Sequence, residues 1–169
     1  MSNDNEQTIG MILYSAISPD YDLRTIAFTD RRVLEIPLSK LSELVHRTEQ
    51  LPSVAAWLME ALNPSTFMGL GSIVGQSMWK KLKKKTEGKK VVVMQEGQLP
   101  QQLANLAVHQ VPYEKINSVK MKKIPFSDDY YLNLGAGFIH SRNIVFQGSE
   151  ADEVRRLVER TPLAPKIKT

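Results

Sequence analysis

The pattern of apolar and polar positions predicts strands near the start of the chain. Residues 8–17 form a run rich in Ile, Leu and Tyr that is ended by turn-forming residues at 18–20. Residues 23–38 contain two runs of alternating apolar and polar positions, separated by the polar turn 29–31. Such a pattern predicts one strand followed by a β-hairpin.

The alternating pattern returns in the second half of the chain. The turns are supplied by Pro125 with residues 127–129, and by the Gly-Ala-Gly sequence at 135–137. The strands predicted in this half are residues 91–95, residues 116–124, residues 130–134, and a closing hairpin of residues 138–140 and 143–147.

Helical spacing dominates the middle of the chain and recurs at its end. We predict helices after Ser39, over residues 52–62, from about Thr66 into the following lysines, and after Pro100. Their apolar stripes recur at i, i+3 and i+4, as on one face of a helix. The last helix is predicted to begin at Ser149, with acidic residues in its first turn, and to stop before Pro162.

This order of elements predicts an α+β fold. About seven short antiparallel strands would form a bent β-barrel or sandwich, and the last helix would cap its open end. We expect a disordered N-terminus over residues 1–7, a single domain over residues 8–161 and a loose C-terminal tail over residues 162–169. The helical insertion would span residues 39–90.

Composition narrows the classes of protein that fit. The 169 residues suit one domain, and the absence of cysteine excludes disulfides and thiolate chemistry. The first residues carry Asp4 and Glu6, with no basic residue before Arg24, unlike a secretory signal. We therefore expect a cytoplasmic protein.

The positive charge of the chain comes from one short segment. Residues 80–91 hold seven lysines and Glu87, whereas the whole chain has a net charge of only +4. The remainder is therefore slightly acidic. A nucleic-acid-binding protein more often spreads basic residues over a face of its fold.

Several short motifs resemble those of the bacterial and archaeal pleckstrin-homology-like (PH-like) domains. They are IAFTDRRVLEI (26–36), VPYEKINSVKMKK (111–123), NIVFQ (143–147) and ADEVRRLVER (151–160). The resemblance implies a PH-like barrel of about seven strands with a C-terminal helix, and some members carry a glycine-rich insertion like residues 66–85. It does not transfer a phosphoinositide site, because the corresponding loop, ISPDYDLR, is net acidic.

No pattern in the sequence predicts catalysis. The three histidines have no metal-ligand spacing. Asp128 and Asp129 are adjacent and are predicted to be turn residues, and residues 135–137 lack the helix that a dinucleotide-binding motif needs. We therefore expect no enzyme activity, no metal and no cofactor.

The uncharged run at residues 61–79, followed by the lysines, is the strongest functional candidate. Pro64 and several polar residues make it a poor membrane span. An apolar side next to a polybasic patch is typical of reversible attachment to anionic membrane. Packing of the apolar part on its own domain is the alternative structural interpretation, and lysines at a helix end also complement the helix dipole.

The sequence therefore predicts a non-catalytic binding or scaffold module at an anionic membrane surface. Protein–protein interaction or homo-oligomerisation through the insertion helices is one alternative, and non-specific binding of nucleic acid through the lysines is another. The predicted membrane or partner contacts are Phe67, Leu70, Ile73, Val74, Met78, Trp79, Lys80, Lys81, Lys83, Lys84, Lys85, Lys89 and Lys90.

Overall fold

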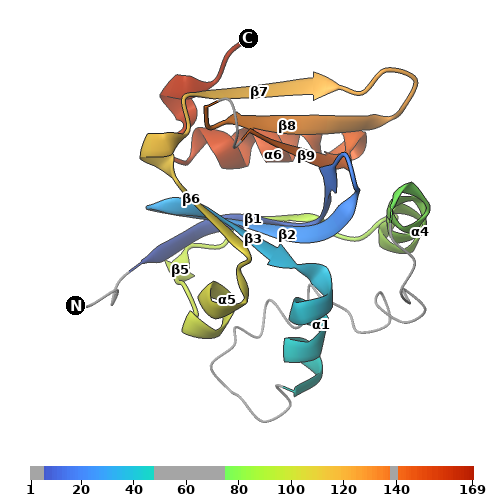
Figure 1. The fold of residues 1–169 in the computed structure, drawn as a ribbon, viewed down its shortest axis with the longest axis horizontal. Helices are drawn as coiled ribbons and strands as arrows, with labels where there is room; N and C mark the ends of the chain where they lie inside the picture. Colours follow the sequence, from blue (N-terminus) through green and yellow to red (C-terminus); the bar gives the residue numbers. More distant parts are fainter. Residues whose placement is uncertain (1–5, 48–74, 138–140) are drawn as a thin grey trace.

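The computed structural model describes residues 6–47, 75–137 and 141–169 (Figure 1). Its centre is a curled antiparallel sheet in the order β6-β3-β2-β1-β9-β8-β7, and two further short strands, β4 and β5, pair with β1. The strands are β1 (Gln7–Ser18), β2 (Asp22–Thr29), β3 (Arg32–Pro37), β4 (Val92–Val93), β5 (Gly97–Gln98), β6 (His109–Pro112), β7 (Ser118–Lys123), β8 (Asp129–Gly135) and β9 (Arg142–Gln147).

Strand β1 belongs to both halves of the curled sheet. Its first part pairs with β4 and β5 on the edge opposite β2, whereas its end, from Ala16 to Ser18, pairs with β9 on that edge. The register with β2 shifts between Ile12 and Ser15. Such an irregularity bends a strand and increases its twist. The long first strand can therefore turn from one half into the other.

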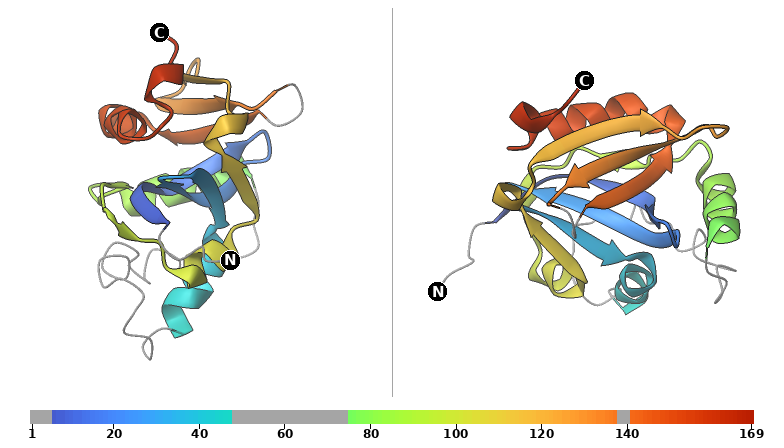
Figure 2. Two further views of the ribbon diagram at one scale, coloured as in Figure 1. Left: turned by 90° about the vertical axis from the view of Figure 1, so that its left-hand side faces the viewer. Right: turned by 45° about the horizontal axis from the view of Figure 1, so that its top comes forward.

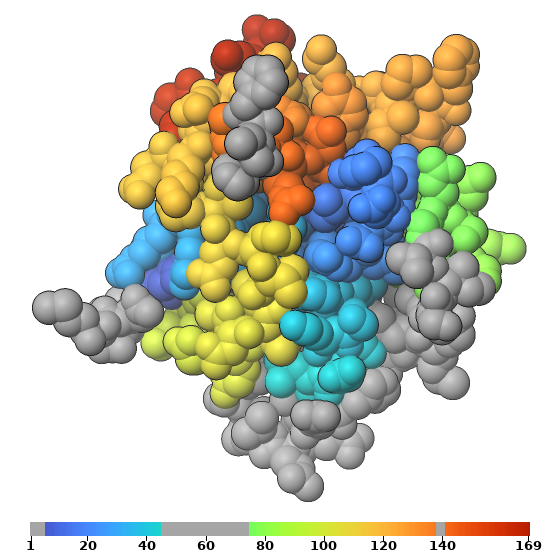
Figure 3. All heavy atoms as spheres, in the orientation of Figure 1, coloured from blue at the N-terminus to red at the C-terminus, as the bar shows by residue number. Residues whose placement is uncertain are grey.

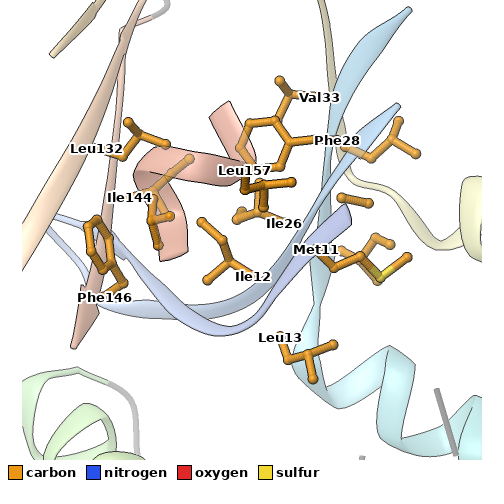
Figure 4. Close-up of a cluster of buried hydrophobic side chains, with 14 of the residues drawn as sticks. Met11, Ile12, Leu13, Ile26, Phe28, Val33, Leu132, Ile144, Phe146 and Leu157 are labelled. Atoms are coloured by element: carbon orange, nitrogen blue, oxygen red, sulfur yellow. The ribbon is translucent and has the colours of Figure 1, made fainter. Parts of the chain in front are cut away.

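The hydrophobic core lies inside this curl (Figure 4). All residues of β1 from Met11 to Ile17 are buried, which explains why this strand has a continuous rather than an alternating apolar pattern. Helix α6 (Ala151–Glu159) lies beside the sheet and packs against β1 and β4 (Figure 2). A side chain at Gly10 would come within 2.5 Å of Leu157, so glycine permits this close approach.

The helices otherwise follow the predicted order. They are α1 (Leu38–Arg47), α4 (Gln76–Thr86), α5 (Gln101–Leu106) and the C-terminal α6. The helix predicted over 52–62, the start of the helix predicted from Thr66, and strand residues 138–140 lie outside the described residues. The α+β class, the curled sheet with a seven-strand path and the C-terminal helix are confirmed.

Both predicted loose ends need correction. Glu6 is buried and Gln7 begins β1, so the disordered N-terminus predicted to reach residue 7 is wrong for these two residues. The C-terminal segment also docks. Leu163 is fully buried, Ile167 forms a parallel bridge with Val119, and the Lys168 amide donates to the Val119 carbonyl at 2.8 Å. This backbone pairing and apolar burial hold a segment that was predicted to be loose.

The start of α6 differs slightly from the prediction. Residues Gly148–Glu150 form a 3-10 turn, and the helix N-cap position is Glu150 rather than Ser149. No side-chain capping bond is made there, although Asp152 and Glu153 fill the acidic first turn as predicted. These carboxylates complement the positive end of the helix dipole.

Candidate functional site

Helix α4 has one buried side and one lysine side. Met78, Trp79, Leu82 and Thr86 are buried. Lys80, Lys81 and Lys84 are exposed, and their spacing of i, i+1 and i+4 places them together on the opposite side of the helix. We call these three residues the lysine face. Its positive charge is displayed outward because the apolar side is used for docking.

The docking of α4 depends on Asp129, the first residue of β8. The indole nitrogen Nε1 of Trp79 donates to Asp129 Oδ2 at 2.9 Å, and Lys83 Nζ lies 2.9 Å from both carboxylate oxygens. Lys83 also lies 5.8 Å from the centre of the Trp79 ring. The buried carboxylate is thus both hydrogen-bonded and charge-compensated, which its burial requires.

This arrangement corrects two interpretations of the sequence. Asp129 was expected to be a simple turn residue, but it is buried and anchors a helix far away in the chain. Trp79 was expected at a membrane–water boundary, but it is 2% exposed. Its indole is therefore occupied in docking, as are Met78 and the charge of Lys83.

The C-terminal end of α4 is held by a second polar contact. The Thr86 hydroxyl donates to the Leu82 carbonyl at 2.9 Å and accepts a 2.8 Å hydrogen bond from Gln147 of β9. Together with the Asp129 contacts, this bond joins α4 to two neighbouring strands. The lysine face therefore has a defined position relative to the sheet.

The remaining predicted contact residues fall into two groups. Lys90 is exposed, whereas Lys85 and Lys89 are half-buried and each has an interaction. The apolar candidates Phe67, Leu70, Ile73 and Val74 lie outside the described residues. The structure therefore places the lysines of the predicted site and two of its apolar residues, Met78 and Trp79.

An exposed apolar tip stands beside α4 (Figure 3). It is the loop of residues 124–128 between β7 and β8, which we call the hairpin tip. Phe126 at its centre has an exposed fraction of 110%, the level of an isolated residue. The next residue after the tip is Asp129, so the anchor that fixes α4 also places it beside this loop. Sequence reasoning missed Phe126, although an aromatic residue within a Pro-x-Ser-Asp turn was a visible signal.

The cleft between α4 and the start of β8 carries charges of both signs. Lys83, Lys84 and Lys89 line it together with four acidic residues, Glu87, Asp128, Asp129 and Glu150. Burial raises the pKa of Glu150, and the neighbouring Glu153 acts in the same direction while Ser149 opposes it. This mixture does not favour a phosphate group, so the exposed lysine face is the better candidate for anions.

A second polar cluster joins two of the motifs that resemble PH-like domains, residues 26–36 and 111–123. Arg32 makes a two-pronged ion pair with Glu6, at 2.9 Å from Nε to Oε1 and 2.6 Å from Nη2 to Oε2. The Thr29 hydroxyl donates to Glu6 at 2.6 Å, and the Tyr113 hydroxyl donates to the Thr29 carbonyl at 2.6 Å. The turn at 29–32 and the Pro-Tyr segment therefore form one hydrogen-bonded structural unit.

The pKa values in this cluster follow from its contacts. Burial alone would raise the pKa of Glu6, but hydrogen bonds from Arg32 and Thr29 and the charges of Arg32 and Arg31 outweigh it, so this pKa lies below its ordinary value. Burial, with the negative charges of Asp30 and Glu6, raises the pKa of Tyr113. These directions favour an ionised Glu6 and a protonated Tyr113, the forms that accept and donate the hydrogen bonds described above.

A cavity of about 190 Å³ lies between β7, β8, α6 and the C-terminal segment, and its lining contains no carboxylate side chain or imidazole. Within residues 6–47, 75–137 and 141–169, no group of three or more His, Asp or Glu side chains could hold a metal ion.

No protein-family model, curated protein or solved structure matches the chain. Among the described helices, none has the length and apolar character needed to cross a bilayer. The described features that bear on function are the lysine face of α4 and the hairpin tip.

Proposed function

We propose that this chain is a non-catalytic PH-like module that attaches peripherally to anionic membrane through the lysine face of α4. The observation that carries the proposal is that the two sides of α4 have different roles. Its apolar side is occupied by docking, and three lysines are presented together to the outside. A lysine near an anionic bilayer contributes about 1 kcal/mol to binding.

The PH-like part of the proposal is supported by topology. The long first strand is shared by the two halves of the sheet, and the C-terminal helix lies beside the sheet and packs against β1 and β4. The residues that resemble the family also contact one another through Thr29 and Tyr113. These features agree with the family pattern of a bent barrel capped by a helix.

Membrane is favoured over nucleic acid by the chemistry of the lysine face. Lysine acts as a flexible point charge and reads base edges poorly, whereas arginine gives bidentate contacts. The described part of α4 contains no arginine. Lipid headgroups require only a suitably placed positive surface, which this helix provides.

Removal of the lysine face should weaken vesicle binding by about 100-fold at low salt, because three lysines contribute about 3 kcal/mol. The variant is Lys80→Gln, Lys81→Gln and Lys84→Gln. Lys83 is kept because it pairs with Asp129. Binding is measured by flotation with vesicles of phosphatidylcholine containing phosphatidylserine, and with phosphatidylcholine alone.

A matched control removes the same number of charges from other elements. Lys40, Lys115 and Lys168 are exposed and lie on α1, after β6 and in the C-terminal segment. Their change to Gln should leave most of the binding intact. Equal losses in the two triple variants, or no binding of the wild type to anionic vesicles, would overturn the proposal. Tighter binding to DNA or RNA than to vesicles would favour the nucleic-acid alternative.

A further inference from the structure

The hairpin tip places an aromatic residue where its backbone favours glycine. The Ser127 amide donates to the Ile124 carbonyl at 3.2 Å, which closes a four-residue turn with Pro125 and Phe126 at its centre. Phe126 has φ of +60°, as the third position of a type II turn requires. Glycine or asparagine adopts this conformation easily, whereas a bulky residue there is a strained exception.

Phe126 also gains nothing from packing on its own domain. Its ring is fully exposed, although apolar surface left in water forfeits the stabilisation that burial provides. Among the described residues, Val108 is the other large apolar side chain classed as exposed, and its exposed fraction is 40%. Backbone strain combined with full exposure at one residue points to a use outside the fold.

The charges around the tip indicate what kind of surface it meets. Lys122 and Lys123 are exposed at the end of β7, directly before the tip. Asp129 directly after the tip binds Trp79 and Lys83, which brings helix α4 close to the tip (Figures 1 and 3). Asp128 is the acidic residue of the tip, and it lines the cleft that also contains Lys84.

We propose that Phe126 is a membrane anchor that inserts into the boundary between headgroups and acyl chains of an anionic bilayer. Lys122, Lys123 and the lysine face then contact the headgroups around it. This inference rests on the proposed function and adds an apolar component to it. An apolar insertion combined with a basic surface meets the two-signal requirement for stable peripheral attachment.

A lipid surface fits this arrangement better than a protein pocket. Aromatic side chains concentrate at bilayer interfaces, and lysines beside them meet anionic headgroups. The tip is a narrow loop with one protruding ring, and positive side chains come from two separate elements, β7 and α4. A bilayer presents negative charge on all sides of an inserted ring, which complements this distribution.

Replacement of Phe126 by glycine tests the effect of the side chain on vesicle binding separately from its effect on folding stability. Because glycine suits the turn, the melting temperature of F126G should not fall. Its partitioning to anionic vesicles should drop by about tenfold or more, since burial of a Phe side chain contributes at least that much. F126W should bind at least as well as the wild type. Val108→Gly is the matched control at the other exposed apolar residue, and it should bind like the wild type.

A fluorescent label reports insertion directly. The chain has no cysteine, so Phe126→Cys and Val108→Cys each carry an environment-sensitive fluorophore at one position. The label at position 126 should shift to shorter wavelength on anionic vesicles and be quenched by lipids carrying a shallow quencher, whereas the label at 108 should show neither effect.

The possible outcomes distinguish the two proposals. If the protein floats with anionic vesicles but the label at 126 is unchanged, or F126G binds like the wild type, the anchor is overturned and the lysine-face proposal stands. If the wild type binds no anionic vesicles, both are overturned. Loss of binding in F126G with an unchanged melting temperature and rescue in F126W supports the anchor.

Discussion

Replacement of Trp79 by alanine should lower the free energy of unfolding by about 3–5 kcal/mol. The loss has two sources. The large indole is 2% exposed, so its removal leaves a cavity between α4 and the sheet, and Asp129 loses a hydrogen-bond donor while remaining buried. For a chain of this size the melting temperature should fall by roughly 10 °C.

A graded pair of variants separates the two sources. Trp79→Phe keeps most of the packing and removes only the N–H donor, so it should cost about 1–3 kcal/mol. Lys80→Ala, on the exposed side of the same helix, should stay within about 0.5 kcal/mol of the wild type. The measurement is chemical and thermal unfolding followed by circular dichroism. Wild-type stability in Trp79→Ala would show that α4 does not dock through this residue.

The same substitution has a functional consequence. The lysine face has a defined position because Trp79, Lys83 and Thr86 join α4 to β8 and β9. Loosening of α4 should therefore also weaken vesicle binding, although no lysine has been removed. This effect would distinguish a positioned surface from a flexible polybasic segment, whose binding would not depend on Trp79.

Replacement of Glu6 by glutamine should cost about 3 kcal/mol. Glu6 is 5% exposed and binds Arg32 with both carboxylate oxygens, so its loss leaves a guanidinium without a charged partner. The value is at the low end for a buried pair because the Arg32 side chain remains 24% exposed. Glu153→Gln, in an exposed ion pair with Arg156, is the matched control and should change stability by less than about 1 kcal/mol.

The contribution of Glu6 should also depend on pH. Its pKa in the folded protein is below the ordinary value of 4.5, so its contribution is complete above about pH 4.5 and is lost as the pH falls through the folded pKa. Glu150, whose pKa is raised, acts in the opposite direction. Glu150 is present in both wild type and E6Q, so its contribution cancels in the difference between their free energies of unfolding. This difference should shrink on acidification. A difference independent of pH would contradict this assignment.

Local pattern was sufficient for most of the secondary structure. The hairpin of β2 and β3 was predictable because alternating residues flank a polar turn, and α6 because an apolar stripe follows an acidic first turn. Each of these two signals is contained in one short segment of the chain, the range over which strand and helix periodicities act. The lysine segment was visible for the same reason, since charge clustering needs no tertiary information.

At particular residues the local pattern predicted the wrong environment, because the deciding contact is distant in the sequence. Asp129 looks like a turn residue until Trp79, 50 positions earlier, is placed against it. Ile167 looks like part of a loose tail until the edge of β7 is available for pairing. Glu6 looks like a frayed terminus until Arg32 is beside it. In each case the partner is selected by the path of the chain through the sheet, which no short window contains.

By itself the sequence determined an α+β chain with a seven-strand path, a terminal helix and one concentrated source of positive charge. Those properties follow from periodicity and composition, which are local. The tertiary structure alone decided which side of α4 is free, because burial of Trp79 and Leu82 against the sheet leaves Lys80, Lys81 and Lys84 outside. It also decided that the hairpin tip lies close to α4, because Asp129, the residue after the tip, binds Trp79 and Lys83.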